Sequence, residues 1–265
     1  MTLGIPGLLV LGIVVMAVTF LAVWAIAVRV RNAGIVDIAW AGGFSILALL
    51  YAFLAPGWAP RRALIALMTV AWSLRLAGYL YSRVMGEHPK EDGRYVELRR
   101  RWAGRSVDLR FLVFFQVQAL LDVGLSTPML LTSVNPARVF HPLEWAGGGL
   151  WLIAVTGESL ADRQLARFKA DPANRGQVCQ AGLWRYSRHP NYFFEWLVWC
   201  AYFAFAAASP RGWITVYCPA LMLYFLFRVT GIPATEEQAL RTKGDAYREY
   251  QRTTSAFVPW FRRPG

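Results

Sequence analysis

The sequence predicts an all-α integral membrane protein with seven transmembrane helices, its N-terminus outside and its C-terminus in the cytoplasm. Of its residues 56% are apolar and 17% are charged, against about 45–50% and 25% in soluble domains. The apolar residues gather in stretches of about 20, the length that crosses a bilayer as a helix. Short basic segments separate these stretches. This pattern excludes a soluble globular enzyme, a disordered chain and a disulfide scaffold.

Seven apolar stretches are predicted to span the membrane: residues 8–28, 38–60, 63–82, 111–131, a fifth that begins near 143, 191–210 and 212–232. The first lacks a small-residue cleavage site and is interpreted as a retained helix. The first two carry no charge, and the third and fourth carry one each, Arg75 and Asp122. The segment 126–128, Ser-Thr-Pro, is expected to kink the fourth helix.

The positive charge is distributed unequally between the two sides. Of the 28 Lys and Arg residues, 23 lie in four alternate segments: 29–34, 83–110, 163–190 and 228–265. Basic loops stay in the cytoplasm, so these segments and the C-terminus are predicted there. The net charge of +12 is thereby explained by topology and by contact with anionic lipid, and we expect no nucleic-acid partner. The three cysteines and three histidines are too scattered for a metal site.

Polar side chains inside the predicted spans are candidates for function, because burying them in a bilayer is costly. They form stripes at helical spacing: Asp37 alone, then Arg75, Tyr79 and Arg83, then Gln118, Asp122 and Ser126, then Glu158, Asp162 and Lys169, and finally Asn191 and Glu195. All lie toward the predicted cytoplasmic half, which indicates a cavity open to that side. Three structural alternatives stay open: an Asp122–Arg75 ion pair, Tyr79 at the membrane interface and Asp37 as a helix cap.

Residues 182–195 carry the densest motif, Gly-Leu-Trp-Arg-Tyr-Ser-Arg-His-Pro-Asn-Tyr-Phe-Phe-Glu. Pro190 fits the first turn of a helix, whose free N–H groups favour an anion. Arg185 and Arg188 add positive charge, and His189 either shares this role or caps the helix. The sequence has no G-x-G-x-x-G, so a bound nucleotide would sit among helices and loops.

Three segments, 157–169, 182–195 and 236–259, resemble the C-terminal domain of the steroid 5α-reductase family, in particular its bacterial membrane reductases. The resemblance covers about residues 150–260. It implies a single membrane domain over 1–265, with substrate-side helices in 1–140 and a cofactor region in 141–265. The implied reaction is the NADPH-dependent reduction of the Δ4 double bond of a lipophilic 3-oxo steroid or a similar enone.

The resemblance also implies roles for individual residues. The cofactor is expected to contact Glu158, Asp162, Lys169, Arg185, Tyr186, Arg188, His189, Asn191, Glu195, Glu236, Glu237, Tyr247 and Tyr250. For the tail residues of this set, an amphipathic surface helix is the alternative. Asp37 and Tyr79 match the catalytic pair, with Tyr81 as a competitor for Tyr79. The substrate is expected against Trp40, Arg75, Gln118 and Asp122. In this scheme Asp37 polarises Tyr79, which hydrogen-bonds the carbonyl oxygen of the enone while hydride is transferred.

A second family fits part of the same pattern. Arg-His-Pro-x-Tyr before a span, a Glu pair and a Tyr-x-x-Tyr tail also resemble membrane methyltransferases of the isoprenylcysteine and phospholipid type, which use S-adenosylmethionine. A lipid-binding protein without catalytic activity is the third possibility. We expect a monomer in a bacterial inner membrane, or in the endoplasmic reticulum if the source is eukaryotic.

Overall fold

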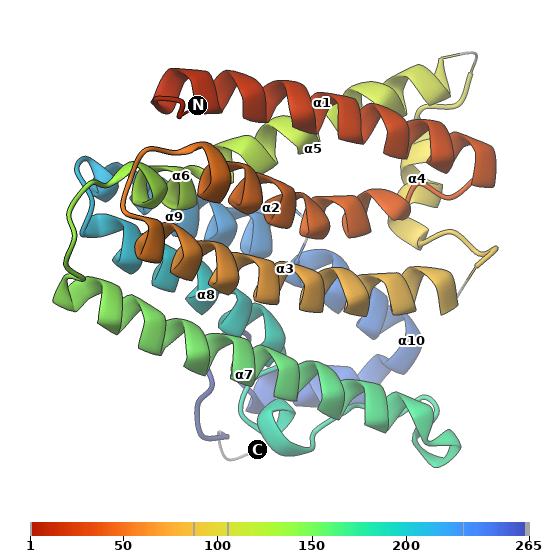
Figure 1. The fold of residues 1–265 in the computed structure, drawn as a ribbon. Coiled ribbons are helices and arrows are strands. Elements are labelled where there is room, and N and C mark those ends of the chain that lie inside the picture. The colour runs from red at the N-terminus through yellow and green to blue at the C-terminus, as the bar shows by residue number, and fades with distance from the viewer. Residues whose placement is uncertain (1, 87, 105, 230, 263–265) are drawn as a thin grey trace. The chain divides into compact units, whose positions relative to one another are not determined.

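The computed structural model describes residues 2–86, 88–104, 106–229 and 231–262. In these ranges the chain is helical and has no β-strand, apart from a bridge between Ser187 and Ser255. The helices are shown in Figure 1: α1 (Ile5–Val30), α2 (Ile35–Leu54), α3 (Ala59–Gly86), α4 (Gly93–Arg101), α5 (Val107–Leu125), α6 (Thr127–Val134), α7 (Pro142–Ala170), η1 (Pro172–Asn174), η2 (Gly182–Arg185), α8 (Pro190–Ala207), η3 (Gly212–Val216), α9 (Tyr217–Tyr224), η4 (Phe225–Val229) and α10 (Ile232–Thr253).

Each of the seven predicted spans falls on helical structure, and two are interrupted. The fourth breaks at Ser126, where α5 ends and α6 begins with Pro128 in its first turn, so the predicted kink is confirmed. The seventh is divided into η3, α9 and the π-helical η4. The second ends at Leu54, earlier than predicted. The loop that follows packs tightly, because a Cβ on Gly57 would lie 2.3 Å from the Ser133 carbonyl oxygen.

Five segments are long and apolar enough to cross a membrane: Ile5–Val30, Ile35–Leu54, Ala59–Gly86, Val107–Val134 and Gly212–Thr253. The all-α class is therefore confirmed for the described residues, and these five segments indicate an integral membrane protein. The other two predicted spans, α7 and α8, are not among these five. α7 carries several charged residues in its second half, including Glu158, Asp162 and Lys169, which lower its hydropathy.

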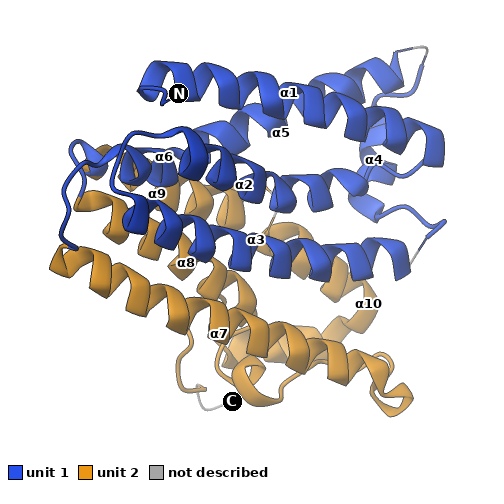
Figure 2. Ribbon diagram, in the orientation of Figure 1, with its two compact units in different colours: residues 1–140, 209–212 blue, residues 141–208, 213–265 orange. Residues whose placement is uncertain are grey.

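The chain forms two compact units, coloured separately in Figure 2. Unit 1 contains residues 1–140 and 209–212, and unit 2 contains 141–208 and 213–265. The boundary after residue 140 coincides with the predicted one, while the assignment of substrate-side helices to 1–140 and of a cofactor region to 141–265 stays a prediction. The short segment 209–212 is the exception, since it packs with unit 1, where Ser209 Oγ accepts a hydrogen bond from Asn135 at 3.1 Å.

In unit 1, α2 packs along α3 and α1 packs along α5. The α2–α3 contact combines rings and hydroxyls: Phe44 lies 5.6 Å from Trp72 between ring centres, and Ser45 Oγ donates to Ser73 Oγ at 2.7 Å. Ser73 Oγ in turn donates to the Ala41 carbonyl at 2.5 Å. Hydrogen bonds between hydroxyl groups of neighbouring helices satisfy polar groups for which the hydrocarbon of a bilayer offers no partner.

In unit 2, α7 packs along α8 at close range. A Cβ on Gly147 would lie 2.8 Å from the Phe205 backbone nitrogen, and one on Gly157 would lie 2.4 Å from the Phe194 ring. Small residues at these points let the two helix backbones approach. A buried cluster of Leu226, Ile232 and Phe257, covered by side chains of α8, ties η4, α10 and the C-terminal tail together.

Candidate functional site

Asp37, in the first turn of α2, accepts hydrogen bonds from two other helices of unit 1. The Tyr95 hydroxyl donates to Asp37 Oδ1 at 2.5 Å, and Arg94 Nη2 donates to Asp37 Oδ2 at 2.9 Å. Arg83, near the end of α3, reaches the same Oδ2 at 3.3 Å. The carboxylate thus joins α2, α3 and α4. Its side chain does not cap α2, so the capping alternative is wrong.

Tyr95 is the phenol that the structure places on Asp37, and the sequence prediction missed it. The residue is buried, and its ring centre lies 6.3 Å from that of Phe114 in α5. Burial, and after it the negative charge of Asp37, raises the pKa of Tyr95 well above its usual value, so the hydroxyl stays protonated. In the sequence, Tyr95 is one aromatic residue in a basic segment, and nothing there links it to Asp37.

Tyr79 lies one helical turn before Arg83 on the same face of α3. Because Arg83 contacts Asp37, this face turns toward the α2 N-terminus. Tyr79 and Arg75 are half-buried, whereas Tyr81 is 57% exposed. Of the two competing tyrosines, Tyr79 is therefore better placed for a role inside unit 1.

Asp122, on α5, is fully buried at 0% exposure. Neither of its carboxyl oxygens has a hydrogen-bond partner among the described residues, so the structure does not contain the Asp122–Arg75 ion pair that was left open. The carboxyl lies against α2 and α1, since a Cβ on Gly43 would be 2.4 Å from Asp122 Oδ2 and 2.5 Å from Met16 Cε. A buried polar group without a partner is costly and is often functional.

The other predicted substrate residues are spread through unit 1. Trp40 packs edge-on against Phe44, with 5.2 Å between ring centres, and thereby joins the aromatic row between α2 and α3. Gln118 is half-buried on α5, one turn before Asp122. Of the predicted substrate residues, Trp40 therefore lies at the contact between α2 and α3, and Asp122 lies where α5 meets Gly43 of α2.

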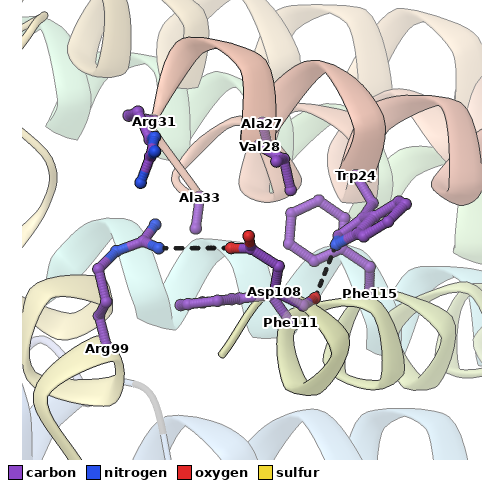
Figure 3. Close-up of a pocket in the computed structure, with 9 residues that line it drawn as sticks. All are labelled: Trp24, Ala27, Val28, Arg31, Ala33, Arg99, Asp108, Phe111 and Phe115. Carbon is purple, nitrogen blue, oxygen red and sulfur yellow. Dashed lines mark hydrogen bonds and ion pairs between the residues drawn. The ribbon is translucent and has the colours of Figure 1, made fainter. Parts of the chain in front are cut away.

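A cavity of about 10 Å³ lies where α1, α4 and α5 meet (Figure 3). Arg99 forms an ion pair with Asp108 at 4.0 Å and lies 4.8 Å above the Phe111 ring centre, while Trp24 Nε1 donates to the Asp108 carbonyl at 2.9 Å. This volume is about that of one water molecule. The residues of Figure 3 therefore hold α4 in place and leave no room for a larger ligand.

Unit 2 brings together the three segments that carry the family resemblance. The Trp184 indole donates to the Ala161 carbonyl at 2.9 Å, which joins the 182–195 segment to α7. The Tyr250 hydroxyl donates to the carbonyls of Trp184 and Ser187, which joins the same segment to α10. Tyr247 and Tyr250 are both buried, whereas Glu237 and Arg248 of the same helix are exposed, so α10 is amphipathic, as the open alternative states, with its two tyrosines on the buried face.

Five polar residues of the predicted cofactor set lie on α7 and α8. Asn191 Nδ2 donates to Asp162 Oδ1 at 3.3 Å. Glu158 precedes Asp162 by one turn, and both are buried, while Glu195 follows Asn191 by one turn and is half-buried. The buried Asn191 Oδ1 has no hydrogen-bond partner among the described residues, so it is available to a ligand that donates. Lys169, at the end of α7, is exposed.

Arg188 and His189 bind Glu236 of α10. Arg188 Nε donates to Glu236 Oε1 at 2.6 Å, and His189 Nε2 lies 3.2 Å from the same oxygen. Gln251 Nε2 donates to Glu236 Oε2 at 2.8 Å. His189 occupies the N-cap position of α8 but its side chain does not cap the helix, so that alternative is wrong. The cluster is an internal clamp between the start of α8 and α10.

The three remaining predicted cofactor residues also lie outside this clamp. The Glu237 side chain is 64% exposed and pairs with Arg241 at 2.5 Å on the surface of α10. Arg185 is exposed. Tyr186 is also exposed, and its ring centre lies 6.3 Å from that of Phe261 in the C-terminal tail. Across the described residues, no group of three or more His, Cys, Asp or Glu is placed to hold a metal ion.

Comparison with known proteins gives a family without an assigned activity. An uncharacterized protein of Schizosaccharomyces pombe is 28% identical over 262 residues, which cover 89% of this chain and 75% of the yeast protein. No solved structure matches the chain. The profile of the family described as "Protein of unknown function (DUF1295)" matches residues 23–254, which include most of both units. The chain therefore belongs to the DUF1295 family.

Proposed function

We propose that the protein is a membrane-embedded reductase that uses NADPH to reduce the Δ4 carbon–carbon double bond of a lipophilic 3-oxo steroid or a similar enone. In this proposal α7 and α8 also span the membrane, which gives seven spans with the N-terminus outside and the C-terminus in the cytoplasm. The protein acts as a monomer, in a bacterial inner membrane or, for a eukaryotic source, in the endoplasmic reticulum.

The observation that carries the proposal is the meeting of the three family-like segments in unit 2. These segments lie apart in the sequence, yet the loop before α8 bonds to α7 through Trp184 and to α10 through Arg188 and Tyr250. An internal clamp of this kind fixes the loop before α8 and so holds Asn191 at the start of that helix.

The residues on α7 and α8 have the chemistry to hold the ribose and carboxamide parts of the cofactor. Asp162, Glu158 and Glu195 offer carboxylate oxygens, and Asn191 offers the unsatisfied Oδ1. All of these atoms accept hydrogen bonds, as ribose hydroxyls and a carboxamide NH2 require. Three carboxylates repel phosphate, so we assign the phosphate groups to a separate basic residue, Lys169, at the exposed end of α7.

Unit 1 supplies the groups for the enone in this proposal. NADPH would supply the hydride that adds to the β-carbon and would leave as NADP+, and a proton from water would add to the α-carbon, so that the double bond becomes a single bond. The Tyr79 hydroxyl donates a hydrogen bond to the carbonyl oxygen as negative charge develops there. Asp37, held by Arg94, Arg83 and Tyr95, orients the α2 and α3 ends and is a positioning residue.

Nucleotide binding by the detergent-purified protein tests the proposal first. NADPH is expected to raise the melting temperature of the protein. Asn191→Ala is expected to abolish that rise, because it removes the side-chain amide whose Oδ1 accepts a hydrogen bond from the cofactor. Asp245→Asn, on a 94% exposed residue of α10 that is outside the predicted cofactor set, is the control and is expected to leave the rise unchanged. No stabilisation of the folded protein by NADPH, or equal losses in both variants, would contradict the cofactor assignment.

Turnover is measured next, as NADPH oxidation with testosterone or progesterone. Tyr79→Phe is expected to lower kcat at least 100-fold, within the range of general acid–base contributions. Tyr95→Phe is expected to lower the melting temperature, because it removes a hydrogen bond to Asp37, and to change kcat much less than Tyr79→Phe does. Full turnover in both Asp37→Ala and Tyr79→Phe would show that this pair is assigned wrongly.

A second candidate is an S-adenosylmethionine-dependent methyltransferase of the isoprenylcysteine or phospholipid type. The contacts of Arg188 and His189 with Glu236 favour it, because they join the Arg-His-Pro-x-Tyr motif to the Glu pair that this family also has. S-adenosylmethionine is therefore included beside NADPH and NADH in the melting experiment. Stabilisation by S-adenosylmethionine without NADPH would replace the reductase proposal.

A further inference from the structure

The C-terminal tail forms one wall of a pocket in unit 2, which we call the tail pocket. It has a volume of about 340 Å³ and is lined by Arg188, Gln251, Arg252, Thr254, Ser255, Ala256, Val258, Trp260 and Phe261. Apart from Arg188, these residues come from the end of α10 and from the tail that follows it. Neither the predicted cofactor set nor the predicted substrate set includes the residues of the tail.

The polar lining of the tail pocket favours an anion. It contains two arginines and no acidic residue. Arg188 is already bound to Glu236, whereas Arg252 pairs with Glu249 at 2.7 Å on the surface, an exposed contact of little energetic value that a stronger acceptor replaces. Thr254 is only 4% exposed, and its Oγ1 has no hydrogen-bond partner among the described residues. A phosphate oxygen in the pocket supplies the acceptor that this hydroxyl lacks.

Backbone hydrogen bonds hold the tail pocket in shape. The Arg188 N–H donates to the Ser255 carbonyl at 2.8 Å, and the Trp260 N–H donates to the Tyr186 carbonyl at 2.9 Å. The Ser187 hydroxyl donates to the Phe257 carbonyl at 2.8 Å. Because these bonds pin the tail along residues 186–188, a ligand does not have to order the pocket wall when it binds.

The apolar lining indicates that the anion belongs to a lipid. Val258, Trp260 and Phe261 line the pocket and are exposed, Trp260 at 69% and Phe261 at 77%. The same tail inserts Phe257 into the buried cluster with Leu226 and Ile232, and α8 covers that cluster. The tail therefore joins an apolar helix end to a cationic surface, and Trp beside Arg is typical of the membrane–water interface.

We propose that the tail pocket binds the phosphate headgroup of an anionic phospholipid. Arg252 and the Thr254 hydroxyl contact the phosphate, and Trp260 and Phe261 lie against the glycerol and the first part of the acyl chains. The site ties the end of α10 to the lipid surface. This inference does not depend on the reductase proposal, since none of these four residues has a role there.

Lipid binding by the full-length protein in a neutral detergent tests the inference. The protein is titrated with phosphatidylglycerol and with phosphatidylcholine of the same short chain length, and bound lipid is counted by native mass spectrometry while the melting temperature is followed. Phosphatidylglycerol is expected to bind and to stabilise, and phosphatidylcholine is expected to do so much less. Arg252→Ala and Thr254→Val are each expected to weaken phosphatidylglycerol binding about tenfold, the effect of one lost charge-assisted hydrogen bond.

Two matched controls separate the pocket from general surface effects. Arg248 is 70% exposed on α10, close to the 68% of Arg252, and Trp213 is 70% exposed, close to Trp260, yet neither lines the pocket. Arg248→Ala and Trp213→Ala are expected to bind phosphatidylglycerol as the unaltered protein does. Equal losses in controls and pocket variants, equal binding of the two lipids, or an Arg252-dependent stabilisation by inorganic phosphate or NADPH that equals or exceeds the stabilisation by phosphatidylglycerol would each overturn the inference. For a variant whose melting temperature is already lowered in the absence of lipid, the number of bound lipid molecules from native mass spectrometry decides the outcome.

Discussion

At the scale of the residue, the stability of unit 1 depends on whether a buried carboxylate has hydrogen-bond donors. Asp37 has three donors, while Asp122 on α5 has none among the described residues. Burying a carboxyl without compensation costs free energy, so Asp122 weakens unit 1 unless a ligand uses it. Gly43 is the residue that makes room for it, because any larger side chain there meets the carboxyl.

We predict that Gly43→Ala destabilises the protein and that Asp122→Ala partly reverses this loss. The added Cβ would lie 2.4 Å from Asp122 Oδ2, closer than van der Waals contact allows, and overpacking of this kind costs about 1–3 kcal/mol. Melting temperatures of the two single variants and the double variant form the test. Additive effects would mean that Gly43 and Asp122 do not meet, and Gly42→Ala, with open space around its Cβ, is the control.

Neighbouring glutamates in α10 are predicted to behave differently. Glu236 is 15% exposed and paired with the 11% exposed Arg188, whereas Glu237 is 64% exposed. Glu236→Gln leaves the buried Arg188 charge without its carboxylate, which costs on the order of 3 kcal/mol. Glu237→Gln removes only a surface pair and is expected to change the melting temperature little. Equal shifts in the two variants would refute the clamp between α8 and α10.

At the scale of an element, α4 shows how a short polar helix is fixed to apolar ones. Nine residues with several arginines are not stable as a helix alone. Asp92 caps α4, since its Oδ1 accepts from the Arg94 N–H at 2.9 Å. At its other end, Trp102 packs against Phe111 of α5 with 5.2 Å between ring centres. Capping, ion pairs and ring contacts therefore position α4 together.

The α4 cap is predicted to weaken in acid. Burial by itself would raise the pKa of Asp92, but the hydrogen bonds and positive charge of Arg94 outweigh it and hold that pKa below its usual value. A carboxyl with a lowered folded-state pKa contributes its full stability above the unfolded pKa of about 3.9, and loses that contribution as pH falls through the folded value.

Amide exchange of α4, expressed as protection relative to the intrinsic rate at each pH, measures this effect. Protection is expected to fall below about pH 4 in the unaltered protein. Asp92→Asn keeps the cap but cannot titrate, so its protection is expected to change less with pH. The same acid dependence in both proteins would assign it to other carboxylates, such as Glu91, which accepts from the Ala33 N–H at 2.7 Å.

At the scale of the whole molecule, the proposed topology depends on α7 and α8. The five apolar segments and the proposed seven spans both place the C-terminus opposite the N-terminus, because each count is odd. They differ in the segment between α7 and α8, which is cytoplasmic if both helices cross and outside if neither does. Basic residues in 163–190 favour the cytoplasmic side.

Cysteine labelling in intact cells distinguishes the two arrangements. With Cys179, Cys200 and Cys218 replaced, single cysteines are placed at the exposed positions Val96, Val139 and Gln180. We predict that an impermeant maleimide labels Val139→Cys in intact cells, and that it labels Val96→Cys and Gln180→Cys only after the membrane is opened. Labelling of Gln180→Cys in intact cells would contradict the seven-span proposal.

The sequence by itself determined the all-α class, the positions of the apolar helices, the break at Ser126 and the first turn of α8 at Pro190. These features follow from composition, helical period and local stereochemistry, which act within a few residues. Only the tertiary structure decided that Asp37 binds Tyr95, that Glu236 and not Glu237 meets Arg188, and that Asp122 does not pair with Arg75. The two pairs that form, Asp37–Tyr95 and Arg188–Glu236, join residues 58 and 48 positions apart. Helix packing selects these partners among several side chains of the same chemistry, and helical periodicity carries no information about that packing.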